Sequence, residues 1–491
     1  MEAVYIDSSL PEKETKIRCH FGECIMMENA AAALEKAVLG CGAECSVFVL
    51  CGGGNNGGDG LALARRIYGK CKVSVFLAEA PRTEEARIQY EMTKAAGVPF
   101  VQNDEPLECY TVFVDCLFGT GFHGKLSEDY AALILRVNEA DGVKIACDIP
   151  SGIDKNGCIE TKDAGGSPVA FRADKTVTMG ALKTALFSDE AKDFTGTIEK
   201  AGLGVSDFVF EKNTEPDAYI IEKSDIQLPH RKKKSAHKGM FGHTAVVIGE
   251  KPGAAILAGT AALRFGTGLV TCITDSSAKG DGVSFLMPPE LMTGNSFPEK
   301  TTSVLLGSGL GTDKNSIVSK TVSFIYDMEK PSAVFDADFF SYPEAPSVLK
   351  KLNDRKNAQI IITPHPKELC MLINSCLSEK YEVSFTVSHR FELSRQWSKA
   401  FPNIVLVAKG ANTYIFKGGR AFICSCGTNA LAKAGSGDVL AGLCASLLAQ
   451  GYDALEAAKT AVYAHASSST TFTPDYALTP LLLIDRIETS L

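Results

Sequence analysis

The chain has 491 residues, a length that predicts roughly two to four domains with ample hydrophobic core. Its formal net charge of -8 argues against nucleic acid or an anionic membrane surface as the main partner. The N-terminus, MEAVYIDSSLPEKE, has no apolar signal region, and no apolar run reaches the ~18 residues of a membrane span, so we expect a cytoplasmic protein without membrane contact.

A glycine-rich stretch, CGGGNNGGDG, occupies residues 51–60. The preceding SVFVLC has the pattern of a buried strand, and the following LALARRIY has apolar residues at helical spacing. Gly52, Gly54 and Gly57 satisfy G-x-G-x-x-G, and Glu79 follows the next strand-like run, where a ribose-binding acid would lie. The stretch therefore predicts an anion cradle at a helix N-terminus, with a purely structural turn as the alternative.

Five strand-like runs alternate with helical patterns through about residue 200: SVFVLC, KVSVFLA, TVFVD, VKIACD and KTVTM. This alternation predicts a parallel, doubly wound sheet. Two of the runs end at acids, Asp115 and Asp148, and Ser151 follows the second. Since ligands bind beyond the carboxyl ends of parallel strands, these oxygens and Asn56 would hold a monovalent cation or ribose and amide groups. For each acid taken alone, a helix cap is the alternative.

A polar, irregular stretch occupies residues 211–240, and we place a domain boundary in it near residue 222. It contains a basic cluster, Arg231–Lys234, which we interpret as a solvated linker rather than a phosphate site. Sixteen cysteines occur with no C-x-x-C pair and no export signal, so most are expected to be buried thiols and a metal site is the less favoured reading.

A second α/β pattern begins at TAVVIG and continues through LVTCIT, SVLLG, AVFDAD, QIIIT and NIVLVA. It ends in two long helical patterns around residues 429–449 and 453–470. Gly435, Ser436 and Gly437 precede Asp438 and an apolar helix, so backbone N–H groups would form an anion hole beside a carboxylate. This arrangement suits phosphoryl transfer, with Asp438 accepting the proton of the attacking hydroxyl; a capped helix start is the alternative.

Several motifs in fixed order resemble known families. GGGNNGGDG, DCLFGTG, DIPSGID and VTMGALKTAL resemble the epimerase of hydrated NAD(P)H, NAD(P)HX. HKGMFGHTAVVIG, GSGLGT, FDAD, TPHPKEL, KGANTY and AGSGDVLAG resemble the ADP- or ATP-dependent NAD(P)HX dehydratase. Together they cover nearly the whole chain in the order of the fused bacterial repair enzyme. The resemblance implies a Rossmann-like epimerase domain at 1–222 and a ribokinase-like α/β dehydratase domain at 223–491.

The resemblance also implies the chemistry of each half. The N-terminal half would interconvert the R and S forms of NAD(P)HX at C6 of the hydrated nicotinamide ring. The C-terminal half would dehydrate the S form to NAD(P)H at the expense of ADP or ATP, through a phosphorylated intermediate. The implied cofactors are K⁺ in the epimerase domain and Mg²⁺ with ADP or ATP in the dehydratase domain. We expect small-molecule partners, no nucleic acid, and a homo-oligomer.

The implied site residues fall into five groups. The catalytic residues would be Asp438, Asp115 and Asp148. Epimerase substrate contacts would be Asn55, Asn56, Gly57, Gly58, Asp59, Gly119, Thr120, Gly121, Phe122, His123, Gly124, Lys125 and Asp148. K⁺ ligands would be Asn56, Asp115 and Ser151. Dehydratase substrate contacts would be Ala254, Gly311, His365 and Asp438. Nucleotide contacts would be Lys409, Gly410, Ala411, Asn412, Thr413, Thr428, Asn429, Ala430, Leu431, Ala432, Lys433, Ala434, Gly435, Ser436 and Gly437.

The sequence departs from the family patterns in three places and leaves two alternatives open. The N-terminal opening CHFGECIMMENAA lacks the polar lead expected of the family. GTNALAKAGSGD lacks a glycine-proline pair, and GSGLGT has Ser308 where proline is common. The first alternative is a ribokinase-type small-molecule kinase with a dinucleotide-sensing N-terminal domain. The second makes the N-terminal half a non-catalytic interaction module.

Overall fold

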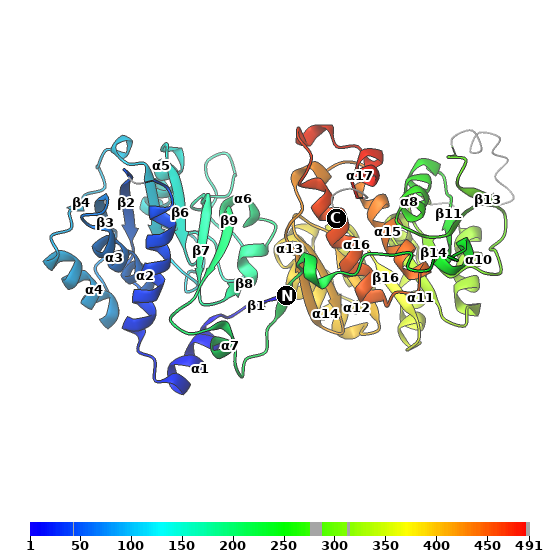
Figure 1. Ribbon diagram of the computed structural model, residues 1–491, viewed down its shortest axis with the longest axis horizontal. Helices are drawn as coiled ribbons and strands as arrows, with labels where there is room; N and C mark the ends of the chain where they lie inside the picture. Colours follow the sequence, from blue (N-terminus) through cyan, green and yellow to red (C-terminus); the bar gives the residue numbers. More distant parts are fainter. Residues whose placement is uncertain (43, 275–286, 312–314, 488–491) are drawn as a thin grey trace. The chain divides into compact units, whose positions relative to one another are not determined.

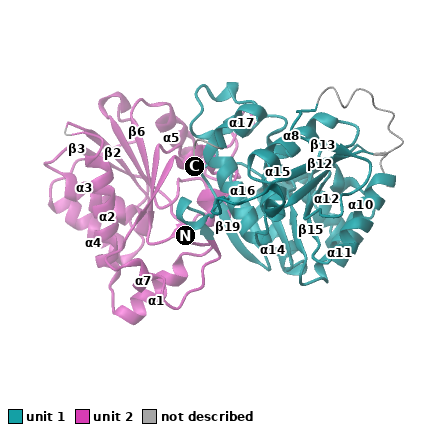
Figure 2. Ribbon diagram, turned by 45° about the vertical axis from the view of Figure 1, so that its right-hand side comes forward, with its two compact units in different colours: residues 1, 219–491 teal, residues 2–218 magenta. Residues whose placement is uncertain are grey.

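The computed structural model describes residues 1–42, 44–274, 287–311 and 315–487 (Figure 1). The chain forms two compact units (Figure 2). Unit 2 contains residues 2–218, and unit 1 contains residue 1 and residues 219–491. No helix within the described ranges is both long enough and apolar enough to cross a membrane.

Unit 2 is built on a sheet whose neighbouring strands are all parallel. Across the sheet the strands are β4 (Phe100–Val101), β3 (Lys72–Leu77), β2 (Ser46–Cys51), β5 (Val112–Cys116), β6 (Val143–Cys147), β7 (Lys175–Met179) and β9 (Thr197–Ala201). The five strand-like runs are confirmed as β2, β3, β5, β6 and β7, and the Rossmann-like, doubly wound sheet is confirmed with them. The sequence patterns missed β9, because TIEKA is short and contains two adjacent charged residues, Glu199 and Lys200.

Helices cover both faces of this sheet because successive strand residues point to opposite faces. Val47 and Val49 pack in one core with α2 (Glu23–Leu39) and α3 (Asn55–Ile67). Phe48 and Leu50 pack in the other core with α5 (Glu128–Glu139). The remaining elements of this unit are β1 (Glu2–Tyr5), α1 (Ser9–Cys19), α4 (Glu84–Ala95), β8 (Leu182–Lys183), α6 (Lys192–Thr195) and α7 (Asp207–Phe210).

Unit 1 contains a mixed sheet. Its strands, in order, are β13 (Met292–Gly294), β12 (Leu269–Ile273), β11 (His243–Val247), β14 (Ser303–Leu306), β15 (Ser332–Phe335), β16 (Gln359–Ile362), β17 (Ile404–Ala408), β18 (Thr413–Lys417), β19 (Arg420–Cys424) and β10 (Ala218–Ile220). The strands from β13 to β17 are parallel, and β17, β18 and β19 are antiparallel. The expected α/β pattern is therefore confirmed, and the hairpin of β18 and β19 is an addition to it.

Helices also cover both faces of the unit 1 sheet (Figure 2). One core contains α8 (Pro252–Arg264), α15 (Ser436–Ala449), α16 (Ala454–Ser469) and α17 (Pro480–Ile487). The other helices are α10 (Asn315–Asp327), α11 (Ala345–Asn353), α12 (Pro366–Leu377), α13 (Val383–Ser388) and α14 (Arg390–Ala400).

The helix expected from about residue 429 begins at Ser436 instead. Residues Asn429–Leu431 form a separate 3₁₀ turn, and Gly435 adopts a left-handed conformation with φ of 93°. This conformation interrupts any helix that approaches from its N-terminal side. The loop before α15 is therefore irregular backbone.

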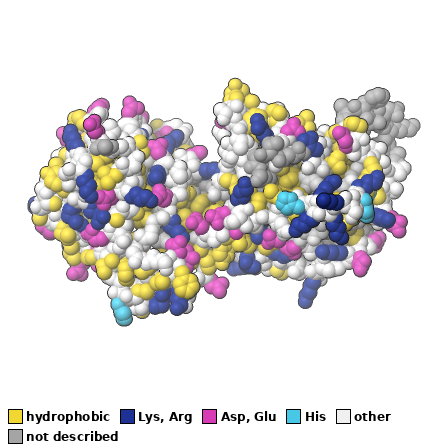
Figure 3. Space-filling view, in the orientation of Figure 1, with side chains coloured by type: hydrophobic (Ala, Val, Ile, Leu, Met, Phe, Trp, Pro, Cys, Tyr) yellow, Lys and Arg dark blue, Asp and Glu magenta, His cyan; other side chains and the backbone are white. Residues whose placement is uncertain are grey.

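Acidic and basic side chains are interspersed on the face of each unit that Figure 3 shows. The basic cluster Arg231–Lys234 is exposed, as expected of a solvated segment. Within it, the Arg231 guanidinium lies 4.5 Å from the centre of the Phe241 ring, a cation–π contact.

Candidate functional site

The candidate site of unit 2 lies where the strand order reverses. β2 has β3 on one side and β5 on the other. After β2 the chain adds strands first on the β3 side of the sheet and then, from β5 on, on the other side. Loops after β2 and β5 separate at such a point and leave a crevice at the carboxyl ends of the strands. Here the loops are Gly52–Gly54 and residues 117–127.

A cavity of about 740 Å³ opens at this crevice, a size that accommodates a nucleotide-like ligand. Ten of the predicted epimerase contacts line it: Asn55, Asn56, Asp59, Gly119, Thr120, Gly121, Phe122, His123, Lys125 and Asp148. Glu79 also lines it and accepts a hydrogen bond from the Tyr130 hydroxyl at 2.8 Å. Gly57, Gly58 and Gly124 are not among the lining residues.

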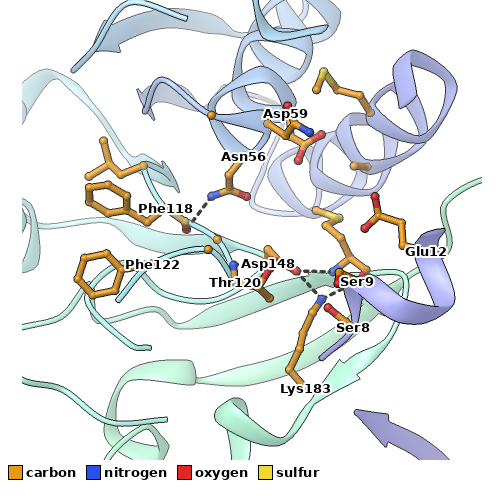
Figure 4. A pocket seen from close by; sticks show the side chains of 18 of the residues that line it. Ser8, Ser9, Glu12, Asn56, Asp59, Phe118, Thr120, Phe122, Asp148 and Lys183 are labelled. Atoms are coloured by element: carbon orange, nitrogen blue, oxygen red, sulfur yellow. Dashed lines mark hydrogen bonds and ion pairs between the residues drawn. The ribbon is translucent and has the colours of Figure 1, made fainter. Parts of the chain in front are cut away.

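Asp148 and Lys183 form an ion pair at the cavity wall (Figure 4). The Lys183 ammonium group also donates to Thr178 Oγ1 at 2.9 Å and to the Met179 carbonyl at 2.7 Å, so its three hydrogens have three acceptors. Asp148 has a φ of 70°, an uncommon value for a residue with a side chain. Its other carboxylate oxygen accepts from the Thr120 N–H at 3.3 Å. These contacts fix a charged carboxylate against the loop that follows β5.

Asp59 is a second acid in the same cavity. Burial raises the pKa of Asp59 well above its usual range, and the negative charge of Asp148 raises it further. Asp59 therefore holds its proton more firmly than a free aspartate does, whereas Asp148 has the Lys183 ammonium group beside it. Two acids with different protonation states can supply a proton and accept one in the same reaction.

Asp115 does not line the cavity; it lies fully buried beneath the loop after β5. Its carboxylate accepts hydrogen bonds from the Ser151 hydroxyl at 2.7 Å, the Ser151 N–H at 2.8 Å and the Leu117 N–H at 3.1 Å. Burial raises the pKa of Asp115 to about 6, and these donors oppose the rise. Asn56 donates to the Phe118 carbonyl at 2.8 Å, while the Phe118 N–H donates to Ser151 Oγ at 3.0 Å.

Two of the three predicted K⁺ ligands, Asn56 and Ser151, thus bond to the backbone of Phe118, and the third, Asp115, bonds to Ser151. They offer an amide, a carboxylate and a hydroxyl oxygen, the hard donors that alkali cations accept. A cation beside Asp115 would favour its ionised form, which burial disfavours. The residues present therefore fit K⁺.

The glycines of the opening motif serve packing more than ligand contact. A Cβ on Gly57 would lie 1.8 Å from the Gly52 carbonyl oxygen, and one on Gly52 would lie 2.0 Å from the Leu117 carbonyl oxygen. Gly54, in contrast, has no atom within 4 Å of such a Cβ and lines the cavity. Gly52 and Gly57 therefore let α3 begin tight against the strand ends, which places Asn55 and Asn56 at the cavity.

Sequence reasoning missed one wall of this cavity. Side chains from the segment of α1 and α2 line it: Ser8, Ser9, Glu12, Lys16, Glu23, Met26 and Met27. Lys16 forms ion pairs of 2.6 Å with both Glu12 and Glu23. No motif marks these residues, since they reach the site only through the packing of α2 on α3. Lys183 was also missed as a site residue, although it lies within the quoted motif VTMGALKTAL.

The candidate site of unit 1 lies at the carboxyl edge of its parallel strands, where five strands end in polar loops. Asp336 follows β15, and its carboxylate accepts from Lys409 Nζ at 2.9 Å and from Thr363 Oγ1 at 2.7 Å. Lys409 follows β17, and Thr363 follows β16. Asp336 is 2% exposed and Lys409 is partly exposed, so the pair is open to the site mainly from the lysine side.

Asp438 lies in the first turn of α15, close enough to Asp336 and Lys409 for their charges to shift its pKa. Burial and then the charge of Asp336 raise the pKa of Asp438 to about 6, while Ser308 and Lys409 oppose the rise. The Ser308 hydroxyl is buried and has no hydrogen bond of ordinary geometry. A carboxylate with a pKa near neutrality, beside a lysine and at a helix start, can accept a proton next to a bound anion.

The start of α15 is held by a buried histidine. His465 Nε2 lies 3.1 Å from Ser436 Oγ and 3.0 Å from the Ser436 carbonyl oxygen. Burial lowers the pKa of His465 to about 4, which keeps it neutral at physiological pH. Gly435 is confined on its other side, since a Cβ there would lie 2.7 Å from Pro480 Cγ.

The predicted nucleotide contacts occupy two segments of this edge. The first segment is the turn between β17 and β18 with the first residue of β18: Lys409, Gly410, Ala411, Asn412 and Thr413. The second lies between β19 and α15 and includes the first two residues of α15: Thr428, Asn429, Ala430, Leu431, Ala432, Lys433, Ala434, Gly435, Ser436 and Gly437. A Cβ on Gly437 would lie 3.4 Å from Lys409 Nζ, so the structure brings the two segments together there. Asn412, Ala430 and Ser436 are buried, which leaves the other residues of the two segments to contact a ligand through their side chains.

The other predicted substrate contacts of unit 1 are His365 at the N-cap of α12, Gly311 in the loop after β14, and Ala254 in the first turn of α8. His365 caps α12 by accepting from the Glu368 N–H at 3.2 Å, and burial lowers its pKa. The Gly311 N–H donates to Asp338 at 2.9 Å, and Ala254 faces the Gly309 backbone. Thr312, the last residue of GSGLGT, lies outside the described residues. Asp336, Asp338 and Glu368 were not among the predicted contacts, although the first two lie at the end of the strand-like run AVFDAD.

The described parts of the chain contain no group of three or more His, Cys, Asp or Glu residues placed to hold a metal ion. Mg²⁺ commonly takes most of its ligands from water and substrate phosphates, with one or two carboxylates. The acidic edge of unit 1 fits that mode of binding.

Comparisons with known proteins cover nearly the whole chain. Residues 23–185 match the family described as YjeF-related protein N-terminus, and residues 244–489 match the family described as NAD(P)H-hydrate dehydratase. A bifunctional NAD(P)H-hydrate repair enzyme of Helicobacter pylori is 40% identical over 496 residues, which is 99% of this chain and 100% of that protein. The enzyme of the same description from Coxiella burnetii is 31% identical over 490 residues, or 96% and 94%. The crystal structure of the ADP/ATP-dependent NAD(P)H-hydrate dehydratase from Bacillus subtilis is similar with a TM-score of 0.43 at 25% identity, covering 53% of this chain and 92% of that one.

Proposed function

The chain belongs to the family of bifunctional NAD(P)H-hydrate repair enzymes, and we propose that its two units hold the two successive active sites of that repair. The protein is an enzyme with an epimerase part and a dehydratase part. We assign NAD(P)HX epimerisation to residues 1–222 and ADP- or ATP-dependent dehydration to residues 223–491. The observation that carries the assignment is that each unit has its own set of ionisable side chains at the carboxyl edge of its own sheet.

Epimerisation requires that the C6 hydroxyl be removed from one face of the ring and restored on the other, or that the ring open and close at C6. Both routes need a proton donor and a proton acceptor at the same carbon. Asp59, whose pKa burial raises, and Asp148, which pairs with Lys183, line one cavity, and we assign the proton-donor role to Asp59 and the acceptor role to Asp148. Asp115 does not reach the cavity and would act by holding the loop after β5.

The cation of this unit would be K⁺, held by Asn56, Asp115 and Ser151. When bound, it would fix the loop that carries Phe118 and compensate the buried charge of Asp115. The chain's own residues then present Gly119 and Thr120 to the substrate, with Thr120 bonded to Asp148.

Dehydration at C6 needs a better leaving group than hydroxide. Asp438 would accept the proton of the C6 hydroxyl as its oxygen attacks the terminal phosphoryl group of the nucleotide. Lys409 and the N–H groups at the start of α15 would hold the negative charge of the transferring group. Loss of phosphate from C6 and of a proton from C5 would then restore NAD(P)H. Mg²⁺ would accompany the nucleotide phosphates and neutralise part of their charge.

The alternatives left open by the sequence are less favoured. A ribokinase-type small-molecule kinase would not explain why a bifunctional NAD(P)H-hydrate repair enzyme aligns with 99% of the chain. A non-catalytic N-terminal module would not need two acids, Asp59 and Asp148, in a cavity large enough for a ligand. The homo-oligomer stays a prediction.

Product analysis tests this function. The purified chain would be incubated with an epimer mixture of NADHX, Mg²⁺ and ADP or ATP, and both NADH absorbance and inorganic phosphate would be followed. We expect NADH and phosphate to appear in equal amounts. Accumulation of a stable phosphorylated compound without NADH would identify a kinase instead.

A further inference from the structure

Two cysteines lie side by side at the amino ends of neighbouring strands in unit 2. Cys45 directly precedes β2, and Cys71 directly precedes β3. These strands are parallel and pair Ser46 with Lys72, so the two cysteines are neighbours in the same register. Their Sγ atoms are 3.0 Å apart.

This geometry nearly meets the requirements of a disulfide. Adjacent strands hold facing residues about 4.8 Å apart, and this spacing lies within the Cα separation of roughly 4.4–6.8 Å that a disulfide spans. A disulfide bond is about 2.05 Å long, so the two sulfurs need to approach by only about 1 Å. Side-chain rotation supplies such a movement without a change in the strands.

The two thiols differ in access. Cys45 is 6% exposed, whereas Cys71 is partly exposed and lies beside Lys70. Burial and the contact with Cys45 raise the pKa of the Cys71 thiol, so Cys71 is largely protonated at neutral pH and its reaction with an oxidant is slow. Cys71 is the thiol that an oxidant reaches, and Cys45 is the thiol placed to resolve it.

We propose that Cys45 and Cys71 form an intramolecular disulfide when the protein meets a peroxide. The Cys71 sulfur attacks the O–O bond of hydrogen peroxide, giving a sulfenic acid and one water molecule. The Cys45 sulfur then attacks the sulfenic sulfur, forming the S–S bond and releasing a second water molecule. The two thiols lose two electrons and two protons in total, and the peroxide accepts both.

The cross-link would join the ends of a segment that holds β2, the glycine loop and α3. The cavity lies at the carboxyl ends of the strands, whereas the cysteines lie at their amino ends. Oxidation would therefore tie the sheet together without changing the cavity. It would also remove the thiol pair from irreversible oxidation.

The test uses the full chain with one molar equivalent of hydrogen peroxide, followed by alkylation of remaining thiols, digestion and mass spectrometry. We expect a peptide that links Cys45 to Cys71, two hydrogens lighter than the separate peptides and lost on treatment with dithiothreitol. Cys45→Ser and Cys71→Ser should each abolish it. Cys424→Ser is the matched control, because Cys424 and Cys426 lie 3.6 Å apart in unit 1 and take no part in the reaction.

The exposed thiols of Cys41 and Cys109 report whether the oxidant reached the protein. Recovery of alkylated Cys45 and Cys71 from a sample in which these two thiols are oxidised would overturn the proposal. A link from Cys71 to Cys41 in place of Cys45 would overturn it as well. Epimerisation by the oxidised chain should stay within twofold of the reduced chain, and a larger loss would contradict the claim that the cavity is unchanged.

Discussion

Lys409 Nζ lies 2.9 Å from Oδ1 of Asp336, and the two residues follow β17 and β15, with β16 between them in the sheet. The negative charge of Asp336 is paired with the positive charge of Lys409, so Asp336 is poorly placed to accept a proton from a substrate. Asp438, which lies near both and whose pKa is raised to about 6 by burial and by Asp336, is the better proton acceptor.

Asp438→Asn should abolish dehydration with little effect on folding. Asparagine has nearly the same shape but cannot accept the hydroxyl proton, so turnover should fall by about 10²- to 10⁴-fold, or about 3 to 5 kcal/mol of barrier. Nucleotide affinity and the melting temperature should stay almost unchanged. Epimerisation in the other unit is the internal control. Dehydration within a fewfold of wild type would remove Asp438 from the mechanism, and loss of both activities with a large fall in melting temperature would indicate a structural role.

Dehydration should depend on pH through the same group. Because Asp438 acts in its ionised form and its pKa is about 6, turnover should rise with pH and level off above about pH 7. If the carboxylate had an ordinary pKa, turnover would rise around pH 4 instead. Single-turnover rates from pH 5 to 8 measure the limb. A flat profile over this range would contradict the assignment, as would an unchanged limb in Asp438→Asn.

Lys183→Met should lower epimerisation because it removes the cation that holds the Asp148 carboxylate. Lys183 is 1% exposed, and methionine fills a similar volume without charge. Because both residues act as one unit, the variant that combines Lys183→Met with Asp148→Asn should lose about as much activity as the more damaging single variant. Losses that multiply would show that the two residues act separately.

Gly57→Ala and Gly54→Ala form a matched pair within one motif. A Cβ at Gly57 would lie 1.8 Å from the Gly52 carbonyl oxygen, so we expect the free energy of unfolding of unit 2 to fall by about 3 kcal/mol, the upper range for overpacking. A Cβ at Gly54 meets no atom within 4 Å, so the change should stay within about 0.5 kcal/mol. Gly54→Ala should instead raise KM for epimerisation, since Gly54 lines the cavity. Equal stability losses in both variants would contradict the packing account.

K⁺ should stabilise unit 2 in a pH-dependent way. The pKa of Asp115 is about 6 in the fold against an ordinary 3.8, so the ionised form is disfavoured in the folded state above pH 6 and this cost disappears as pH falls toward 4. A bound cation offsets the cost. Replacing Na⁺ by K⁺ at constant ionic strength should therefore raise the melting temperature more at pH 8 than at pH 5. Asp115→Asn should show no such response, and a response equal to that of wild type would exclude Asp115 as a ligand.

The sequence predicted the order of strands and helices well because hydrophobic period and strand-end acids are local signals. It also predicted most of the loop residues that line the cavity, such as Asn56 and Thr120. It could not predict the wall formed by α1 and α2, since Glu12 and Met27 meet the cavity only through tertiary packing. Nor could it separate glycines that pack, such as Gly57, from glycines that face a ligand, such as Gly54, because both look alike in a motif.

If two sites in one chain act in sequence, the R epimer supplied alone must pass through both of them. Pure R-NADHX would be mixed with the chain, Mg²⁺ and ADP or ATP, and NADH absorbance and the two epimers would be followed against a sample without protein. We predict that wild type converts all of the R form to NADH far faster than spontaneous epimerisation allows. Asp438→Asn should give a mixture of the R and S forms without NADH. Asp148→Asn should form NADH only as fast as the R form epimerises spontaneously. Wild type that consumes the R form no faster than the protein-free sample would contradict the account.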